Sequence, residues 1–257
     1  MNNSFSLLRL GLLIKKQWFD NAKLYTLSVL ALIGLLSIIF IFWASVNGNN
    51  YDESDTYVIF LILLFGAGLI FASTTFGALS DKAKGTYWLS IPATHFEKLL
   101  CGIFYSLLAF PVVYLASFFL IQQITFAIIR LNPNNIIEPE NNLKKIAIIF
   151  CYIFLALQSL FILGSVYFER YAFIKTILAA LFIIFLFMLT GTLFMKNLLP
   201  HNSGMQGITS FVIYGDNEMK IYRLAPWIED AVIVFAKFIW APVFWVATYF
   251  RLKEKEI

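Results

Sequence analysis

The chain has 257 residues, of which 60% are hydrophobic and only 13% are charged. About a quarter of the residues in a soluble domain are charged, so this composition indicates an integral membrane protein and leaves no polar stretch long enough for a separate soluble domain. The formal net charge of +4 does not indicate nucleic-acid binding, because the Lys and Arg residues flank apolar runs and do not form a patch.

The first predicted element is an amphipathic helix over residues 1–23 that lies in the cytoplasmic membrane interface. Phe5 and Leu8 belong to one apolar helical stripe, whereas Arg9 and Lys16 lie mostly off it. An apolar face beside basic residues suits a helix at the level of anionic headgroups. The alternative is a polar leader that simply precedes the first span. A cleavable signal peptide is not predicted, since no small-residue cleavage site follows a short apolar core.

Six apolar runs follow, and each is long enough to cross a bilayer as a helix, which takes about 20 residues. The third run continues apolar to Ile129, and Pro111 is expected to kink it. The fold class is therefore an all-α integral membrane protein with a single transmembrane domain over 1–257. The six spans are predicted at residues 24–46, 57–79, 99–122, 146–168, 174–195 and 231–250.

The distribution of Lys and Arg predicts that both termini are cytoplasmic. The first loop, residues 47–56, carries acidic residues but no Lys or Arg, whereas the second loop carries Lys82, Lys84 and Lys98. Cytoplasmic loops carry the excess of Lys and Arg. The expected location is the cell membrane, with the chain crossing it several times.

The second span is rich in small residues. Gly68 with Ala72, and Ser73 with Gly77, form small-xxx-small pairs. Such pairs allow the backbone of a neighbouring helix to approach closely. Packing within the chain is their expected use.

The longest outer segment covers residues 196–230. Two β-prone stretches, 209–214 and 218–224, lie on either side of Gly215-Asp216-Asn217, which is typical of a tight turn. This pattern predicts a structured external hairpin before the last helix. The alternative is a pair of short amphipathic helices that dip into the outer leaflet.

The sequence predicts no catalytic, cofactor or metal site. The two histidines fall on opposite sides of the predicted membrane, and Cys101 and Cys151 fit no metal or disulfide pattern. A Gly-rich phosphate loop ending in Gly-Lys-Ser or Gly-Lys-Thr is absent, so the chain is not expected to bind ATP itself. Lys237 lies inside the sixth predicted span, where it either snorkels to the outer surface or faces an internal path.

Residues 80–101, between the second and third spans, contain a helix start signal. Thr94 and Glu97 are spaced as a capping box, in which each side chain can bond the backbone N–H of the other residue. Pro92 excludes a helix immediately before it. A helix is therefore expected to begin at about His95 and to continue into the third apolar run.

Tyr87 and Trp88 precede this turn and are expected to form an exposed aromatic pair. The whole stretch is either a positively charged loop that fixes topology or a docking element for a cytoplasmic partner. Composition and spacing alone favour the first interpretation.

The stretch from Leu89 to Leu100 resembles the start of the third span in membrane subunits of type-2 ABC exporters. Those subunits often carry a Leu-Pro-Val-Ser-like turn followed by Glu-Lys. This chain has Ile91-Pro92 and Glu97-Lys98, with Thr94 in place of the usual Ser and His95-Phe96 where basic residues are common. The predicted leader, six spans and structured second loop agree with the family, whereas its fifth loop tends to hold short re-entrant helices and not a hairpin.

The resemblance implies a permease subunit of an ATP-driven exporter, paired with an identical or different second permease subunit and coupled to a separate ATPase. The chain itself would not be an enzyme, and its substrate would be an amphipathic peptide, drug or lipid-linked molecule. The alternative is a non-transporting membrane scaffold or assembly factor. The residues implied to dock the ATPase are Tyr87, Trp88, Leu89, Ile91, Pro92, Thr94, His95, Phe96, Glu97 and Lys98.

Overall fold

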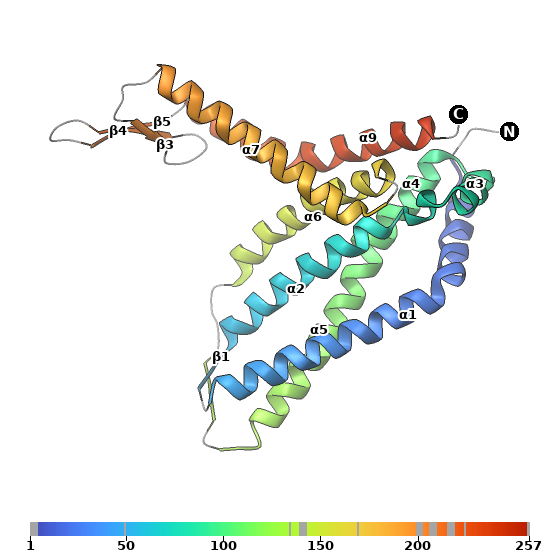
Figure 1. The fold of residues 1–257 in the computed structure, drawn as a ribbon. Coiled ribbons are helices and arrows are strands. Elements are labelled where there is room, and N and C mark those ends of the chain that lie inside the picture. Colours follow the sequence, from blue (N-terminus) through green and yellow to red (C-terminus); the bar gives the residue numbers. More distant parts are fainter. Residues whose placement is uncertain are drawn as a thin grey trace.

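The computed structural model is a bundle of long helices whose two termini lie close together at one end (Figure 1). It describes residues 5–48, 50–133, 135–138, 143–168, 170–198, 203–205, 210–214, 219–223 and 225–255. The α-helices in these residues are α1 (Leu7–Val46), α2 (Glu53–Thr74), α3 (Lys82–Ser90), α4 (His95–Phe104), α5 (Phe110–Ile129), α6 (Leu143–Tyr167), α7 (Ala172–Leu198), α8 (Pro226–Val234) and α9 (Trp240–Glu254).

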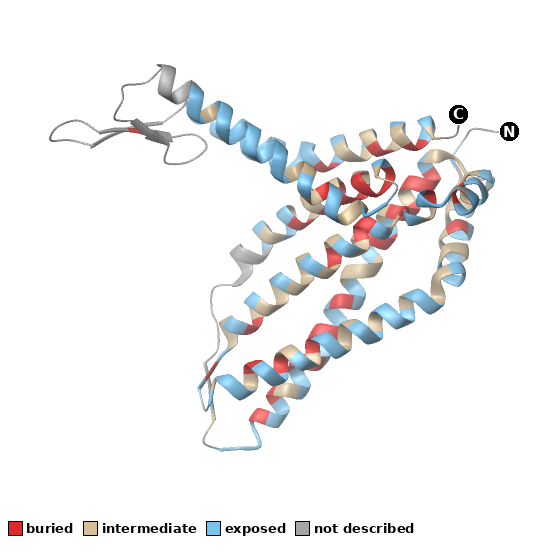
Figure 2. Cartoon of the chain, in the orientation of Figure 1, coloured by how far each residue is buried: buried red, intermediate tan, exposed pale blue. Residues whose placement is uncertain are grey.

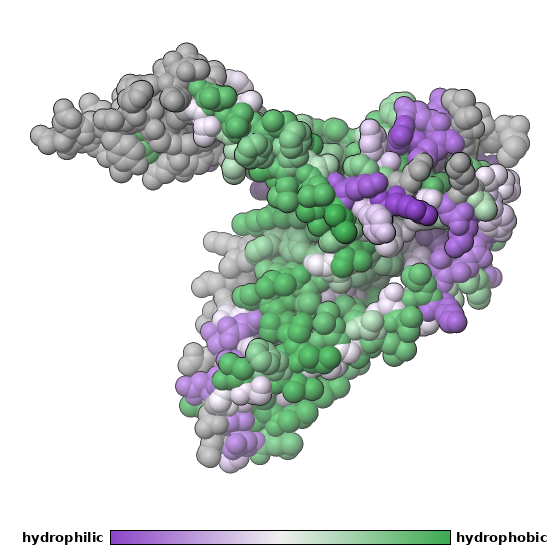
Figure 3. All heavy atoms as spheres, in the orientation of Figure 1, coloured by the Kyte–Doolittle hydropathy of each residue, from purple (hydrophilic) through white to green (hydrophobic). Residues whose placement is uncertain are grey.

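Within the described ranges, six helical stretches are long and apolar enough to cross a membrane, which confirms a multi-pass membrane architecture. Figure 3 shows a broad hydrophobic band between hydrophilic surfaces, one near the two termini and one near β1. The six stretches are Leu7–Val46, Glu53–Thr74, His95–Ile129, Ile148–Tyr167, Ala172–Leu193 and Pro226–Glu254.

The predicted leader and the first span form one uninterrupted helix, α1, which begins at Leu7. Residues 20–24 contain neither Gly nor Pro, so nothing in the sequence interrupts the backbone hydrogen bonds there. In Figure 1, α1 runs past α3 and then changes direction towards the opposite end of the bundle.

The second span begins and ends earlier than predicted, because α2 covers Glu53–Thr74 and not residues 57–79. A 3₁₀ turn over Gly77–Ser80 follows it. The hydroxyl groups of Thr74 and Thr75 both donate to the Phe71 carbonyl of the last turn of α2. Consecutive Thr residues and a nearby Gly lower helix propensity at this point.

The third span begins at His95, as predicted, and reaches Ile129. Its irregularity takes the form of a π-helical turn over Tyr105–Ala109 between α4 and α5, immediately before Pro111. Proline has no N–H to donate to the preceding turn, and π turns accommodate such interruptions within an α-helix. A second π turn, η3 (Phe235–Ile239), joins α8 to α9.

Two small sheets lie in the loops between the helices. The predicted hairpin strands are β4 (Ser210–Tyr214) and β5 (Met219–Arg223), which pair antiparallel, and β3 (Ser203–Met205) adds a further strand. The predicted turn at 215–217 lies outside the described residues. A parallel pair of β1 (Asn50–Asp52) and β2 (Ile136–Glu138), which the sequence did not predict, ties the first loop to the third.

The core of the bundle combines aromatic rings with polar bonds between helices. α1 packs against α5 through rings that include Phe40, Trp43 and Phe118. Gln122 Nε2 donates to Thr56 Oγ1 at 3.0 Å, which joins α5 to α2. Buried polar side chains commonly join helices in this way where no water can replace the partner.

The small-residue pattern of α2 packs within the chain at Gly68 and Ala72, which are both buried. A Cβ added at Gly68 would lie 2.8 Å from Gln158 Nε2 and 2.8 Å from Phe154 Cε2, both on α6. Gly77, by contrast, has no such neighbours. The prediction of close helix packing is therefore confirmed for the first small-xxx-small pair.

Candidate functional site

Residues 82–90 form a helix, α3, and not the loop predicted from the sequence. Asp81 is its N-cap, and its Oδ1 accepts from the Ala83 backbone N–H at 3.0 Å. Asp is a preferred N-cap residue, so this position was a signal that sequence reasoning missed. Gly85 is buried and faces the backbone of the preceding 3₁₀ turn near Leu79. A small residue at that position lets α3 lie close against the end of the second span.

The aromatic pair on α3 divides between surface and core. Tyr87 is 61% exposed. Trp88 is half-buried, and its ring meets the edge of Phe76 with centroids 5.6 Å apart. The prediction of two exposed aromatics is therefore wrong for Trp88, because successive residues of a helix point in different directions.

The turn between α3 and α4 has the predicted geometry. Ile91 is extended, with φ −58° and ψ 130°, as its place before Pro92 requires. The Thr94 hydroxyl accepts from the Glu97 N–H at 3.2 Å, and Glu97 Oε2 accepts from the Thr94 N–H at 2.8 Å. Both bonds of the capping box are therefore present, and the first turn of α4 is fixed.

The other oxygen of Glu97 fastens α1 to this turn. Glu97 is fully buried, and its Oε1 accepts from the Ser6 N–H at 2.8 Å and from Arg9 Nε and Nη2 at 3.2 and 3.0 Å. Burying a carboxylate is costly unless charge and hydrogen bonds compensate it. Arg9 and the Ser6 N–H supply that compensation, so the start of α1 and the α3–α4 turn form one unit. Sequence reasoning did not assign this role to Arg9.

Lys98 holds the C-terminal end of α3. It is almost fully buried, and its Nζ donates to the Leu89 carbonyl at 2.8 Å. The same ammonium lies 5.3 Å from the centroid of the Trp88 ring. A cation that bonds one of the last carbonyls of a helix stabilises its C-terminus. Glu97 and Lys98 therefore support the docking element from inside and are not part of its surface.

The other predicted docking residues lie around this support. Phe96 is exposed and meets Phe5 edge-on, with centroids 5.7 Å apart, while the half-buried His95 meets Tyr249 of α9 at 6.4 Å. The element thus contacts the helices that carry both termini (Figure 2). Of the ten candidate residues, the exposed ones are Tyr87, Pro92 and Phe96, and the half-buried ones are Trp88, Leu89, Ile91, Thr94 and His95.

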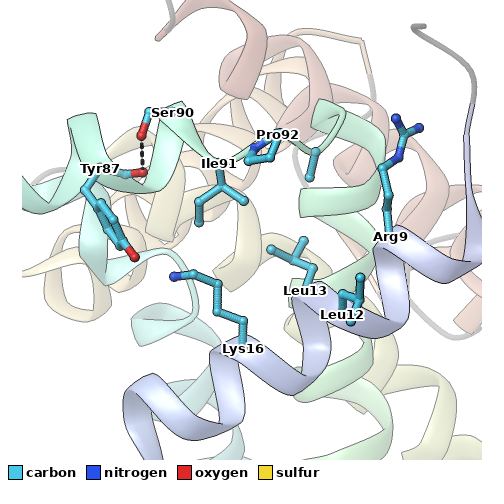
Figure 4. Close-up of a pocket in the computed structure, with 9 residues that line it drawn as sticks. Arg9, Leu12, Leu13, Lys16, Tyr87, Ser90, Ile91 and Pro92 are labelled. Atoms are coloured by element: carbon cyan, nitrogen blue, oxygen red, sulfur yellow. Dashed lines mark hydrogen bonds between the residues drawn. The ribbon is translucent and has the colours of Figure 1, made fainter. Parts of the chain in front are cut away.

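An open groove of about 650 Å³ lies between α1 and the α3–α4 turn. Figure 4 shows Lys16 pointing from α1 towards Tyr87 on α3. The Lys16 Nζ is 4.6 Å from the centroid of the Tyr87 ring and 2.7 Å from Asp20 Oδ2. The lining residues of this groove are Arg9, Leu12, Leu13, Lys16, Tyr87, Ser90, Ile91, Pro92 and Ala93.

A second cavity of about 260 Å³ adjoins this groove and shares part of its lining. It reaches Tyr25 and Tyr105, where α1 is held to α4 and the π turn that follows. The Tyr105 hydroxyl donates to the Ile14 carbonyl at 2.7 Å, and the Cys101 thiol donates to Gln17 Oε1 at 3.2 Å. These bonds keep α1 close to the third span below the groove.

Lys237 lies on the π turn η3 and is exposed on the side of the helix. Its Nζ lies 5.6 Å from the centroid of the Tyr152 ring on α6. Lys237 therefore lies on the surface of this chain, beside α6.

Among the described residues, no three His, Cys, Asp or Glu side chains are grouped so that they could hold a metal ion. No protein-family model, curated protein or solved structure matches this chain. The interpretation of the site therefore depends on its own geometry and on the sequence resemblance of its turn.

Proposed function

We propose that this chain is the membrane-spanning permease subunit of an ATP-driven exporter, coupled to a separate ATPase subunit. The observation that supports this best is the brace around α3. Glu97 bonds the start of α1 and the cap of α4, and Lys98 bonds the end of α3. Because both the end of α3 and the start of α4 are held, the turn between them can pass on a push from a partner without yielding locally.

The proposed docking surface is the exposed part of this braced element. Tyr87, Pro92 and Phe96 are its exposed apolar and aromatic residues, and Lys84 adds a positive charge at its edge. Aromatic residues contribute strongly to protein interfaces. In this proposal the buried residues Glu97 and Lys98 keep the element rigid, and the exposed residues around Tyr87 contact the ATPase.

The proposal includes a second permease subunit, identical or different, with the translocation path between the two. In this arrangement the energy for transport would come from ATP hydrolysis in the partner. The exported substrate would be amphipathic. Both termini and α3 would face the cytoplasm, in accordance with the distribution of Lys and Arg.

The docking proposal is tested with Tyr87→Ala. The chain is expressed together with a phosphate-loop ATPase of the same organism, whose gene is expected beside its own. Pull-down and ATP turnover are then measured. We expect Tyr87→Ala to weaken both, whereas Tyr171→Ala, which changes an exposed tyrosine at the α6–α7 turn, leaves both unchanged. If no such ATPase is retained by the unmodified chain, the scaffold alternative gains support.

The orientation is tested with single cysteines in a background that lacks Cys101 and Cys151. A cysteine at Asp52 is expected to react with a membrane-impermeant thiol reagent in intact cells, and one at Lys84 only after the cells are opened. Both positions are exposed, so a difference between them reports the side of the membrane. Labelling of Lys84 alone in intact cells would reverse the orientation and exclude cytoplasmic docking at α3.

A further inference from the structure

The groove between α1 and the α3–α4 turn combines an apolar floor with basic residues. Leu12, Leu13 and Ile91 supply apolar lining, while Arg9 and Lys16 lie two helical turns apart on α1, about 10 Å along its axis (Figure 4). Each of these two cations is about one-third exposed despite its ion pair, at 32% for Arg9 and 33% for Lys16.

The charge of the lining is predominantly positive. Across the groove and the adjoining cavity, the ionised lining residues are Arg9, Lys16 and Lys84 against one carboxylate, Asp20. Glu97, which neutralises Arg9 from behind, does not line either cavity. When both ion-paired carboxylates, Glu97 and Asp20, are counted against these three cations, one excess positive charge remains, which favours an anionic group over a cationic or neutral one.

The groove also opens next to an apolar surface of α1. Leu12 lines it and is 59% exposed, and Leu8, one turn earlier, is exposed as well. Leu12 belongs to the stretch 1–23 that the sequence predicts to lie in the membrane interface, ahead of the first span at 24–46, so this surface is expected at the level of the headgroups, beside the acyl chains. An occupant with a negative headgroup and an acyl chain would satisfy both parts of the groove.

We infer that this groove is a binding site for an anionic phospholipid, with the phosphate near Lys16 and Tyr87 and an acyl chain along Leu12. Basic pockets beside transmembrane helices hold acidic lipid headgroups in this manner. The site goes beyond the proposed transport function and needs no ATPase partner. Lipid in this groove would fill the space between α1 and α3 and stiffen the junction that Glu97 holds.

The test uses the full chain purified in a neutral detergent. Phosphatidylglycerol and phosphatidylcholine are titrated separately, and retained lipid is counted by native mass spectrometry. We expect preferential retention of phosphatidylglycerol. Lys16→Gln should weaken its binding about fivefold, the effect of one basic residue near an anionic headgroup. Lys15→Gln is the matched control, because Lys15 is exposed but does not line the groove.

A second pair of variants tests the apolar part of the site. Leu12→Ser should reduce retention of phosphatidylglycerol, whereas Leu7→Ser, which changes an exposed leucine of α1 that does not line the groove, should leave it unchanged. Equal retention of the two lipids, or equal effects of Lys16→Gln and Lys15→Gln, would overturn the inference. Displacement of phosphatidylglycerol by inorganic phosphate at equal concentration would also overturn it and assign the groove to a free anion.

Discussion

The consecutive helices α6 and α7 are similar in length and apolar content but differ in their place in the bundle. In the membrane-spanning window of α6, 39% of the residues are buried, whereas in that of α7 only 6% are. α6 packs against α2, α7 and α9. Figure 2 shows α7 exposed along most of its length. Hydrophobicity therefore does not determine which helix occupies the centre of this protein.

The two helices differ in their small and polar residues. On α6, Gln158, Ser159 and Ser165 are buried, and Gln158 Oε1 accepts from the Ser106 hydroxyl at 2.6 Å. On α7, Thr190 and Thr192 are exposed and donate only to carbonyls of their own helix. Lipid is as apolar as a leucine side chain, so close packing and polar bonds select the neighbours of a helix in a membrane.

The largest difference is expected for one substitution made on both helices. A Cβ at Gly164 of α6 would overlap the side chain of Thr176, whereas one at Gly191 of α7 would meet no atom within 4 Å. Gly164→Val should lower the free energy of unfolding by about 3 kcal/mol, as expected for overpacking. Gly191→Val should change it by less than about 0.5 kcal/mol. Thermal unfolding in detergent measures both, and equal effects would contradict the packing difference.

The next effect concerns the polar bond between the third span and α6. Ser106→Ala leaves the buried Gln158 amide without the hydroxyl that bonds it, at a cost of about 1 kcal/mol. Adding Gln158→Leu removes the amide as well, and the double variant should recover most of that loss. Thr190→Ala on α7 is the control and should have no effect. A double variant less stable than Ser106→Ala alone would show that Gln158 has another essential role.

A smaller effect is expected on α2, at the surface that faces α6. Gly68→Ala places a methyl group 2.8 Å from Gln158 Nε2 and should reduce stability by about 0.5 kcal/mol. Gly66→Ala meets no atom within 4 Å and should be neutral or stabilising, because Ala favours the helix by up to about 1 kcal/mol. Chemical denaturation of the two variants measures their free energies of unfolding. Gly68→Ala is expected to lower this free energy and Gly66→Ala to leave it unchanged or raise it.

The smallest effect is expected for Lys237→Met. Lys237 is exposed beside Tyr152 of α6, so it does not contribute to the core, and its loss should change stability by less than about 0.5 kcal/mol. Transport should also be nearly unchanged if the ammonium snorkels to water. A folded variant that no longer transports would instead place Lys237 in the substrate path.

The sequence predicted the features that depend on neighbouring residues. The start of α4 at His95 followed from Pro92, Thr94 and Glu97, which lie within one turn of it. The six spans followed from runs of apolar residues. The helix α3 was missed because Lys82, Lys84 and Gly85 read as a polar loop, although Asp81 capped it.

The features that depend on distant residues were not predictable. Arg9 and Glu97 are 88 positions apart, and nothing near either residue identifies its partner. Likewise, the bond between Ser106 of the third span and Gln158 of the fourth follows only from how the helices pack. Of the candidate site, the capped turn from Pro92 to Glu97 was thus accessible from sequence, whereas the helix α3 and the contacts that brace it were not.

The long separation between Arg9 and Glu97 also has a consequence for biosynthesis. A ribosome releases the start of α1 well before residue 97, so the first two spans are available for insertion while the Arg9 side chain still lacks its carboxylate. The junction can close only when the third span has followed them into the membrane. Assembly of this end of the protein is therefore ordered in time, and a nascent chain arrested before residue 97 would keep α1 unattached.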